Sequence, residues 1–396
     1  MPGLNATFGE SMSDAAATVD ALIAEAIRLK ASHIHVEPEE HALQVRLRID
    51  GLLHKQAALP KDRADEVIAR LKSIAGIDPE QTSIPQQGRL EAKGRQQPIV
   101  FVVSTCPTLH GENVVLSVQE NAMQVRELDA LGLSGRDLRR YKDLINAGCG
   151  IMFVAGPVGS GTTTTIYASL QMLRNGNRNI MAVENEVSFP VKGIHQVAAG
   201  GQEGLGFAAV LRSFVQQDPD VIFAGEIRDK ESAEVCVGAA LTGRLIFSEV
   251  HTDDACSALT RLSDMGVDPF LASPAMLGVL SQRLVRRLCD DCKEPYQLDT
   301  QQLREFGLET RKGAVKVSRG QGCVSCAQTG YRGWLGVFGL LVVSAPIQQL
   351  MLKRADSASI RKLAEKEGMR TVRQAAIEKM LLGLTSPEEV MRVENS

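Results

Sequence analysis

A short glycine-rich stretch constrains the fold more than any other part of this sequence. Residues Ile151 to Ala155 form an apolar run, which is followed by Gly156-Pro157-Val158-Gly159-Ser160-Gly161-Thr162-Thr163 and then by residues able to open a helix. A strand, a glycine-rich turn and a helix in this order can hold phosphate with backbone N–H groups and the helix dipole. The segment fits the pattern G-x-x-x-x-G-K-[ST], except that Thr162 stands where lysine is expected.

Thr162 limits the chemistry that this loop can support. The glycines let successive N–H groups turn toward an anion, so the loop can hold phosphates without the lysine. The lysine normally brings a positive charge to the β- and γ-phosphates in the transition state, which a neutral threonine cannot do. Thr163 keeps the hydroxyl expected to ligate Mg²⁺. The residues expected to bind ATP or ADP are Gly156, Pro157, Gly159, Ser160, Gly161, Thr162, Thr163 and Thr164. On this stretch alone, a glycine-rich turn without a ligand stays an alternative.

The composition narrows the class of protein. A chain of 396 residues is long enough for two or three domains, and 44% apolar with 23% charged residues is typical of soluble globular proteins. The net charge of −3 argues against nucleic acid as the main partner. No apolar run approaches the about 20 residues of a membrane span, and the first residues lack the layout of a signal peptide. We therefore expect a cytoplasmic protein, in which clustered cysteines bind metal rather than form disulfides.

The residues before the loop alternate between helical and strand periodicity. The predicted elements are helices over 14–31 and 61–75, strands over 32–37, 43–51, 90–91 and 99–103, and a turn at 85–89. Together they predict a small α+β domain over 14–119, preceded by a mobile tail and followed by a polar linker over 120–138. Residues two apart on a strand point the same way, so Arg46 and Arg48 share one face, which spacing alone describes as solvated.

Apolar runs after residue 138 predict a wound α/β sheet. The runs begin at Ile151, Ile180, Val221 and Leu245 and alternate with helical segments. Ligands in such sheets bind at the carboxyl ends of the strands. Glu226 ends one of these runs and is therefore expected to meet Mg²⁺ or an attacking water. His251 follows another run at the same edge. A lone histidine is more often structural, but this position raises the odds of a functional role.

Four cysteines have the spacing of a metal site. Cys289 and Cys292 form one C-x₂-C knuckle, and Cys323 and Cys326 form a second. Two knuckles supply the four thiolates of a closed tetrahedral Zn²⁺ site, which is structural because no coordination position is left for water. The other four cysteines, predicted to be core residues, are Cys106, Cys149, Cys236 and Cys256. After residue 343 the periodicity predicts helices to the end of the chain.

These features together resemble the tetracysteine branch of the type II secretion and type IV pilus assembly ATPases (the GspE/PulE/PilB family), over nearly the whole chain. The matching segments are A-S-H-I-H-V-E-P (31–38), V-R-L-R-I-D-G (45–51), S-T-C-P-T-L-H-G-E (104–112), D-P-D-V-I-F-A-G-E-I-R-D (218–229), A-A-L-T-G-R-L (239–245), Q-R-L-V-R-R-L-C (282–289), T-G-Y-R-G (329–333) and T-S-P-E-E-V-M-R-V (385–393).

The resemblance implies a domain order. The expected parts are a mobile tail over 1–13, a PAS-like α+β domain over 14–119, a linker over 120–138, a RecA-like nucleotide-binding domain over 139–286, a tetracysteine zinc subdomain over 287–335 and a C-terminal helical region over 336–396.

The resemblance also implies partners and a mode of action. Members form hexameric rings beneath an inner-membrane platform protein and convert ATP hydrolysis into pilus or pseudopilus assembly. Arg46, Arg48 and Arg89 correspond to arginines that reach the γ-phosphate across a domain interface. Members usually carry a further N-terminal docking domain that this sequence does not show, so docking by the usual route is not expected and the actual route stays open. The location expected is the cytoplasm, and a peripheral position at the inner membrane stays open.

Several positions depart from the family pattern. The acidic box V-E-D-P-V-E reads V-E-N-E-V-S here, so Glu184 is the carboxylate that it keeps. Charged or polar residues of the pattern are also replaced at four further positions, which are Arg244, Gln216, Val102 and Gln87. Nearly every change removes a charge that would polarise water, ligate Mg²⁺ or neutralise phosphate.

The sequence therefore predicts a ring protein that binds nucleotide and hydrolyses it weakly or not at all, alone or with an active paralogue. Its expected catalytic positions are Glu226, Glu184, His251, Arg46, Arg48 and Arg89. Two alternatives stay open at this point. One is an active motor that draws the missing charge from Arg244 or from a neighbouring subunit's Arg46. The other is a regulatory or interaction subunit that binds no nucleotide.

Overall fold

The computed structural model describes residues 14–93, 98–119, 126–188, 190–199, 206–308 and 315–394. The expected tail, residues 1–13, lies outside these ranges. The described chain divides into two compact units. The N-terminal unit contains the described residues up to 119 together with the segments Cys289–Glu294 and Gly320–Gly333, and the C-terminal unit contains the rest.

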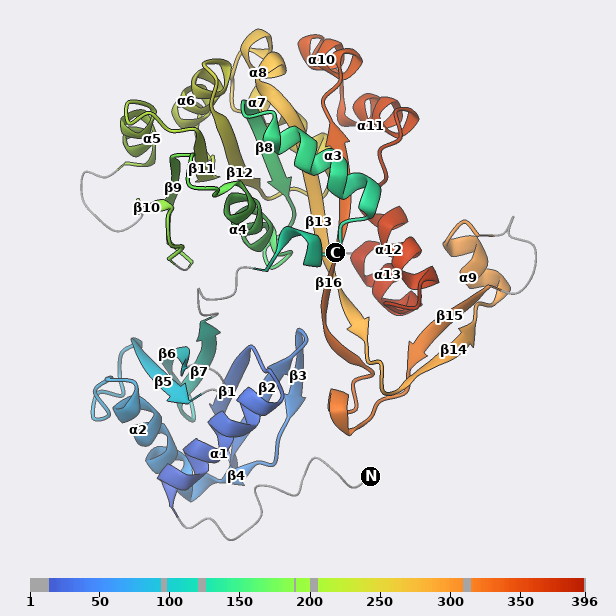
Figure 1. The fold of residues 1–396 in the computed structure, drawn as a ribbon. Helices are drawn as coiled ribbons and strands as arrows, with labels where there is room; N and C mark the ends of the chain where they lie inside the picture. The colour runs from blue at the N-terminus through green and yellow to red at the C-terminus, as the bar shows by residue number, and fades with distance from the viewer. Residues whose placement is uncertain are drawn as a thin grey trace. The chain divides into compact units, whose positions relative to one another are not determined.

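The N-terminal unit is an antiparallel sheet covered by two helices on one face. Its helices are α1 (Ala15–Arg28) and α2 (Ala64–Ile74), the latter preceded by the short 3-10 helix η1 (Lys61–Arg63). Its strands are β1 (His33–Pro38), β2 (Ala42–Ile49), β3 (Leu52–Lys55), β4 (Leu59–Pro60), β5 (Gln86–Lys93), β6 (Pro98–Thr108) and β7 (Gly111–Gln119). The strand order is β3-β2-β1-β7-β6-β5, with β4 paired to β2 (Figure 1). Apolar residues of the strands pack with those of α1 and α2 in one core, which leaves the polar residues on the other face.

One local prediction in this unit is wrong. The turn predicted at residues 85–89 is the beginning of β5, whose Gly88 and Arg89 pair with Val103 and Val102 of β6. Gly88 serves close packing here rather than a turn, because a Cβ at this position would lie 2.3 Å from Ala75 O. A long antiparallel partner strand has therefore overridden the local turn signal.

The C-terminal unit contains the wound α/β sheet that the apolar runs predict. The strand order is β10-β9-β11-β12-β8-β13-β16. The strands are β8 (Gly150–Ala155), β9 (Ile180–Glu184), β10 (His195–Ala198), β11 (Val221–Glu226), β12 (Leu245–Val250), β13 (Met276–Leu288) and β16 (Tyr331–Val342). A separate pair is formed by β14 (Lys293–Gln297) and β15 (Lys316–Gly320).

Helices cover both faces of this sheet. Alternate residues of β8 enter different cores, so Ile151 and Phe153 face one layer while Met152 and Val154 face the other. The first layer contains α5 (Phe207–Val215), α6 (Lys230–Leu241), α7 (Ala255–Asp264), α8 (Pro269–Ala275), α10 (Ala345–Leu352) and α11 (Ser357–Lys366). The second contains η3 (Leu128–Ala130), α3 (Gly135–Asn146) and α4 (Thr162–Leu173). A smaller core gathers α9 (Thr300–Glu305), α12 (Val372–Leu381) and α13 (Pro387–Glu394).

Three further observations bear on the sequence expectations. Within the span expected as a linker, Leu128, Leu131 and Leu133 are buried in the second layer's core. Cys236 and Cys256 are buried as expected, but Cys106 and Cys149 are exposed, so the core assignment is wrong for these two. None of the helices in the described ranges has both the length and the apolar character needed to cross a membrane.

Candidate functional site

The glycine-rich loop joins β8 to α4, as the sequence predicts (Figure 1). Gly161 is the N-cap of α4 with a φ of 83°, and Gly159 has a φ of 82°, both in the left-handed region that favours glycine. A Cβ on Gly156 would lie 2.4 Å from Ser160 Oγ and 2.6 Å from Gln282 O. The backbone thus makes the tight turn into a helix N-terminus that suits a bound phosphate.

All eight residues expected to bind nucleotide lie in this loop or in the first turn of α4. Thr162, at the lysine position, is the first residue of α4 and is only 5% exposed. Thr163 and Thr164 follow it and are half-buried, as is Pro157. The position that normally carries a long cationic side chain is therefore occupied by a small, neutral and buried one.

Gln282 on β13 holds the loop in place. Its Nε2 donates to Ser160 O at 2.8 Å, and its Oε1 accepts from Thr165 Oγ1 at 2.6 Å. Gln282 is 3% exposed, so both hydrogen bonds are shielded from water. One side chain thus fixes the end of the loop to the first turn of α4.

Three carboxylates lie on neighbouring strands at the loop's edge of the sheet. Glu184 is the last residue of β9, and Glu226 is the last residue of β11. Glu249 is the next-to-last residue of β12, in register with Glu226 on one side and with Val154 of β8 on the other. Glu226 was expected at this edge, and the structure places Glu184 and Glu249 there as well.

Glu226 is linked to the loop through His251. Glu226 Oε2 lies 2.6 Å from Arg228 Nε and 3.7 Å from His251 Nε2. The other imidazole nitrogen, Nδ1, lies 3.2 Å from Gly156 O. When both ring nitrogens carry a proton, His251 donates to this carbonyl through Nδ1 and turns its other N–H toward Glu226, which connects the start of the loop to that carboxylate.

Glu184 is buried in a hydrogen-bond network. The Tyr167 hydroxyl of α4 lies 2.7 and 2.8 Å from the two carboxylate oxygens, and Gln196 Nε2 donates to that hydroxyl at 3.1 Å. Burial raises the pKa of Glu184 to about 7, against the lowering effect of the Tyr167 hydrogen bond, while burial and the Glu184 charge raise the pKa of Tyr167. The carboxyl is therefore tied to α4.

The three arginines of the N-terminal unit share one face of its sheet. The register places Arg48 opposite His33, His33 opposite Ser117, and Ser117 opposite Val102, which lies opposite Arg89. Directly paired residues point to the same side of a sheet. Arg46, two residues before Arg48, points the same way.

Two of the substituted positions lie on this arginine face as well. Val102 is in the row just described, and Gln87 is two residues before Arg89 on β5. Arg46 is held by Glu37, whose carboxylate oxygens lie 2.6 and 2.5 Å from its Nε and Nη2. The arginine face therefore carries three guanidinium groups, beside the uncharged side chains of Val102 and Gln87.

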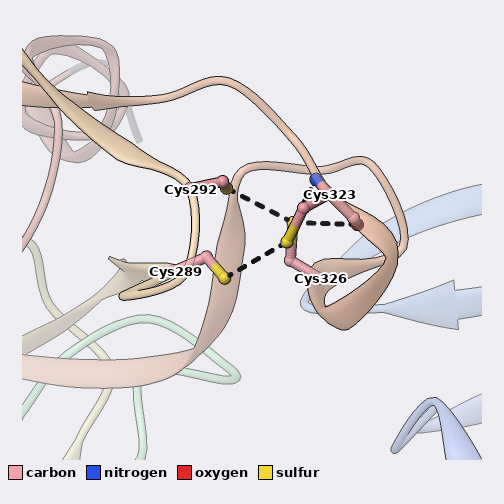
Figure 2. A group of neighbouring side chains, drawn as sticks. All are labelled: Cys289, Cys292, Cys323 and Cys326. Atoms are coloured by element: carbon pink, nitrogen blue, oxygen red, sulfur yellow. Dashed lines mark hydrogen bonds between the residues drawn. The ribbon is translucent and has the colours of Figure 1, made fainter.

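The four paired cysteines converge in the N-terminal unit, as predicted (Figure 2). The Sγ atoms of Cys289 and Cys323 lie 3.8 Å apart, as do those of Cys292 and Cys326, and those of Cys323 and Cys326 lie 3.7 Å apart. A tetrahedral Zn²⁺ with bonds of about 2.3 Å to sulfur places its ligands about 3.8 Å apart. The donor set and its spacing therefore fit zinc.

Backbone contacts support the same site. The N–H groups of Cys323 and Gly330 both lie 3.2 Å from Cys326 Sγ, an arrangement that stabilises a thiolate. Ala327, next in the chain, packs into the core of the N-terminal unit, and the Gly333 N–H donates to Asp50 at 3.2 Å. Metal binding would thus join two chain segments of this unit that are distant in the sequence.

Several residues of these sites were not found from the sequence. Glu249 stood in a recognised strand end, where a carboxylate in an apolar run was an available signal. Gln282, Tyr167 and Glu37 gave no such signal, because their partners are far away in the sequence or lie on another strand.

Comparison with known proteins gives one consistent result. Residues 10–392 match the family described as type II/IV secretion system protein. The chain is 39% identical over 375 residues to the type II secretion system ATPase E of Vibrio cholerae, covering 95% of this chain and 74% of that protein. It is also 39% identical over 374 residues to the type IV pilus assembly ATPase PilB of Thermus thermophilus, covering 94% of this chain but only 42% of that protein.

Solved structures support the fold. The Legionella pneumophila ATPase DotB has a TM-score of 0.73 at 17% identity, covering 98% of each chain. The pilus retraction motor PilT with bound ADP has a TM-score of 0.60 at 21% identity, covering 94% of this chain and 96% of that chain. The expected RecA-like fold is thereby confirmed.

Proposed function

Because the chain belongs to the family of type II/IV secretion system proteins, we propose that it binds nucleotide and hydrolyses it weakly or not at all. The observation that carries this proposal is the intact loop with a buried, neutral Thr162. The glycine conformations and the Gln282 hydrogen bonds preserve a cradle for phosphate. The cradle lacks the charge that would stabilise the transferring phosphoryl group. Removing such a preorganised charge lowers the rate of phosphoryl transfer by roughly a hundredfold or more.

Arg244 does not supply this charge within the same chain. It precedes β12 and donates to the Thr242 carbonyl at 3.1 Å. The loop follows the other end of the parallel strand β8, and six strand residues span about 20 Å. Arg228, which is nearer in the fold, is held by Glu226.

The proposal extends to assembly and partners. The relatives named above are an ATPase of type II secretion and one of type IV pilus assembly. We infer a hexameric ring, made of this chain alone or with an active paralogue, acting against an inner-membrane platform protein. The arginine face of the N-terminal unit, with Arg46, Arg48 and Arg89, would meet nucleotide phosphates in the ring. Particles that sediment as monomers with and without ADP would contradict the ring.

The nucleotide proposal is tested by Thr162→Lys. The wild-type protein should bind ADP and ATP with Mg²⁺ in calorimetry, and its ATP turnover should lie near background. Thr162→Lys should raise turnover at least about tenfold by restoring the charge at the phosphates. The matched control is Gln171→Lys, which adds the same charge to an exposed position of α4 and should change nothing.

The outcomes separate the alternatives. Vigorous wild-type turnover that Thr162→Lys does not increase would show an active motor and overturn the proposal. Wild-type protein that is folded but binds neither nucleotide would favour a regulatory or interaction subunit.

A further inference from the structure

Glu249 lies on β12, the strand between β8 and β11, near the carboxyl ends of these strands where the glycine-rich loop begins. Its strand, β12, pairs with β8, which leads into the loop, and with β11, which ends in Glu226. The other residues of β12 are buried, and Glu249 is half-buried. Burying a carboxylate in an apolar central strand costs desolvation free energy, so the Glu249 carboxylate needs a compensating partner in the folded protein.

The Glu249 carboxylate contacts the loop residue whose hydroxyl is expected to ligate Mg²⁺. Burial raises the pKa of Glu249, and the neighbouring Thr163 side chain opposes this rise. The second carboxylate oxygen, Oε1, is buried and has no hydrogen-bond partner among the residues that the structure describes. Nearby charges do not compensate it fully, since His251 attracts the carboxylate while Glu226 repels it. Glu249 thus lies beside Thr163 of the loop, and its buried Oε1 is available to a ligand.

This arrangement fits a divalent cation. Mg²⁺ is bound through few protein groups and keeps several waters, whose O–H groups need acceptors. Groups behind a metal ligand orient that ligand and raise its basicity. A threonine hydroxyl that donates a hydrogen bond to a carboxylate still has its oxygen lone pairs free to bind the ion.

We propose that Glu249 is a positioning residue of the cation site. In the nucleotide-bound state it accepts a hydrogen bond from the Thr163 hydroxyl, which leaves the hydroxyl oxygen available to Mg²⁺, and it offers Oε1 to the hydration shell of the ion. This inference rests on the proposed nucleotide binding. The inference goes beyond nucleotide binding because it assigns the metal dependence of that binding to a residue outside the loop. A purely structural partner of Thr163 would leave the buried Oε1 without a function.

The test compares ADP affinity with Mg²⁺ and with EDTA, read out by a fluorescent ADP analogue. In the wild-type protein, Mg²⁺ should strengthen ADP binding. In Glu249→Gln, which keeps size and an acceptor for Thr163, this strengthening should fall at least about tenfold while metal-free binding stays the same or improves. Glu249→Asp keeps the charge and should retain part of the Mg²⁺ effect. The Mn²⁺ signal in electron paramagnetic resonance with ADP should show the same order of variants.

The control is Glu234→Gln on α6, an exposed glutamate that lies 3.6 Å from Lys230; it should behave as wild type. Equal loss of affinity with Mg²⁺ and with EDTA in Glu249→Gln would show that Glu249 only shapes the loop, which overturns the inference. Wild-type protein that binds no ADP under either condition would instead overturn the proposed function and the inference with it. Should Glu249→Gln fail to fold, an unchanged Mg²⁺ effect in both Glu249→Asp and Glu249→Thr would overturn the inference equally.

Discussion

The glycine-rich loop should lose much of its order when Gln282 is truncated. In Gln282→Ala, Ser160 O loses its donor at 2.8 Å, and Thr165 Oγ1 loses its acceptor at 2.6 Å. Ser160 is 4% exposed and Thr165 is 0% exposed, so water cannot easily replace the lost partner. Each unsatisfied buried polar group costs about 1–3 kcal/mol, and Thr165 can regain part of this by donating to Gly161 O in its own helix. The expected loss of stability is therefore about 2–4 kcal/mol.

The effect should appear both locally and in binding. Hydrogen exchange of the segment 156–165 should accelerate, and the urea midpoint of the protein should fall. ADP must then restore the order of the loop as it binds, so its affinity should fall at least about tenfold, the equivalent of about 1.4 kcal/mol.

Gln282→Glu gives the same position a pH-dependent signature. A protonated carboxyl can still donate to Ser160 O, whereas a charged carboxylate opposes this carbonyl and cannot. The pKa of the new carboxyl should thus be higher in the folded than in the unfolded state. Gln282→Glu should therefore approach wild-type stability at acidic pH. This stability should be lost as pH rises from the pKa of the carboxyl in the unfolded state through its pKa in the folded state.

The control for both variants is Gln171→Ala, an exposed position on α4, where a change within about 0.5 kcal/mol is expected. The reasoning is refuted if Gln282→Ala costs no more than this control and leaves exchange in the loop unchanged.

Two further predictions concern the buried acid and the cysteines. Burial raises the pKa of Glu184 from 4.5 to about 7, so the contribution of Glu184 to stability falls by up to about 3 kcal/mol as pH rises between these two values. Glu184→Gln should therefore have a higher melting temperature than the wild-type protein at pH 8 but not at pH 4. An equal difference in melting temperature at both pH values would contradict this. Metal analysis should find about one zinc per chain, and either a strong chelator or Cys323→Ser should lower the melting temperature of the protein. Four freely titratable thiols in a protein without zinc would refute the zinc site.

Features that depend on neighbouring residues could be predicted from the sequence. The glycines at 156, 159 and 161 identified the turn into α4, because the required backbone angles favour glycine. The Asp50-Gly51 pair that follows β2 is a local signal of the same kind, since both residues have positive φ. By contrast, the signal at residues 85–89 failed because a partner strand stabilised the extended chain there.

What the sequence determined by itself is the chemistry that is present. It placed a neutral threonine in a glycine-rich loop, two arginines on one strand face, and four thiols in two knuckles, since each of these follows from local spacing. Only the tertiary structure decided which groups act together. It brought Gln282 to the loop from another strand, tied Glu184 to Tyr167, and set Glu249 behind Thr163. The reason is physical: strand order and register, which local periodicity does not encode, determine which distant side chains meet.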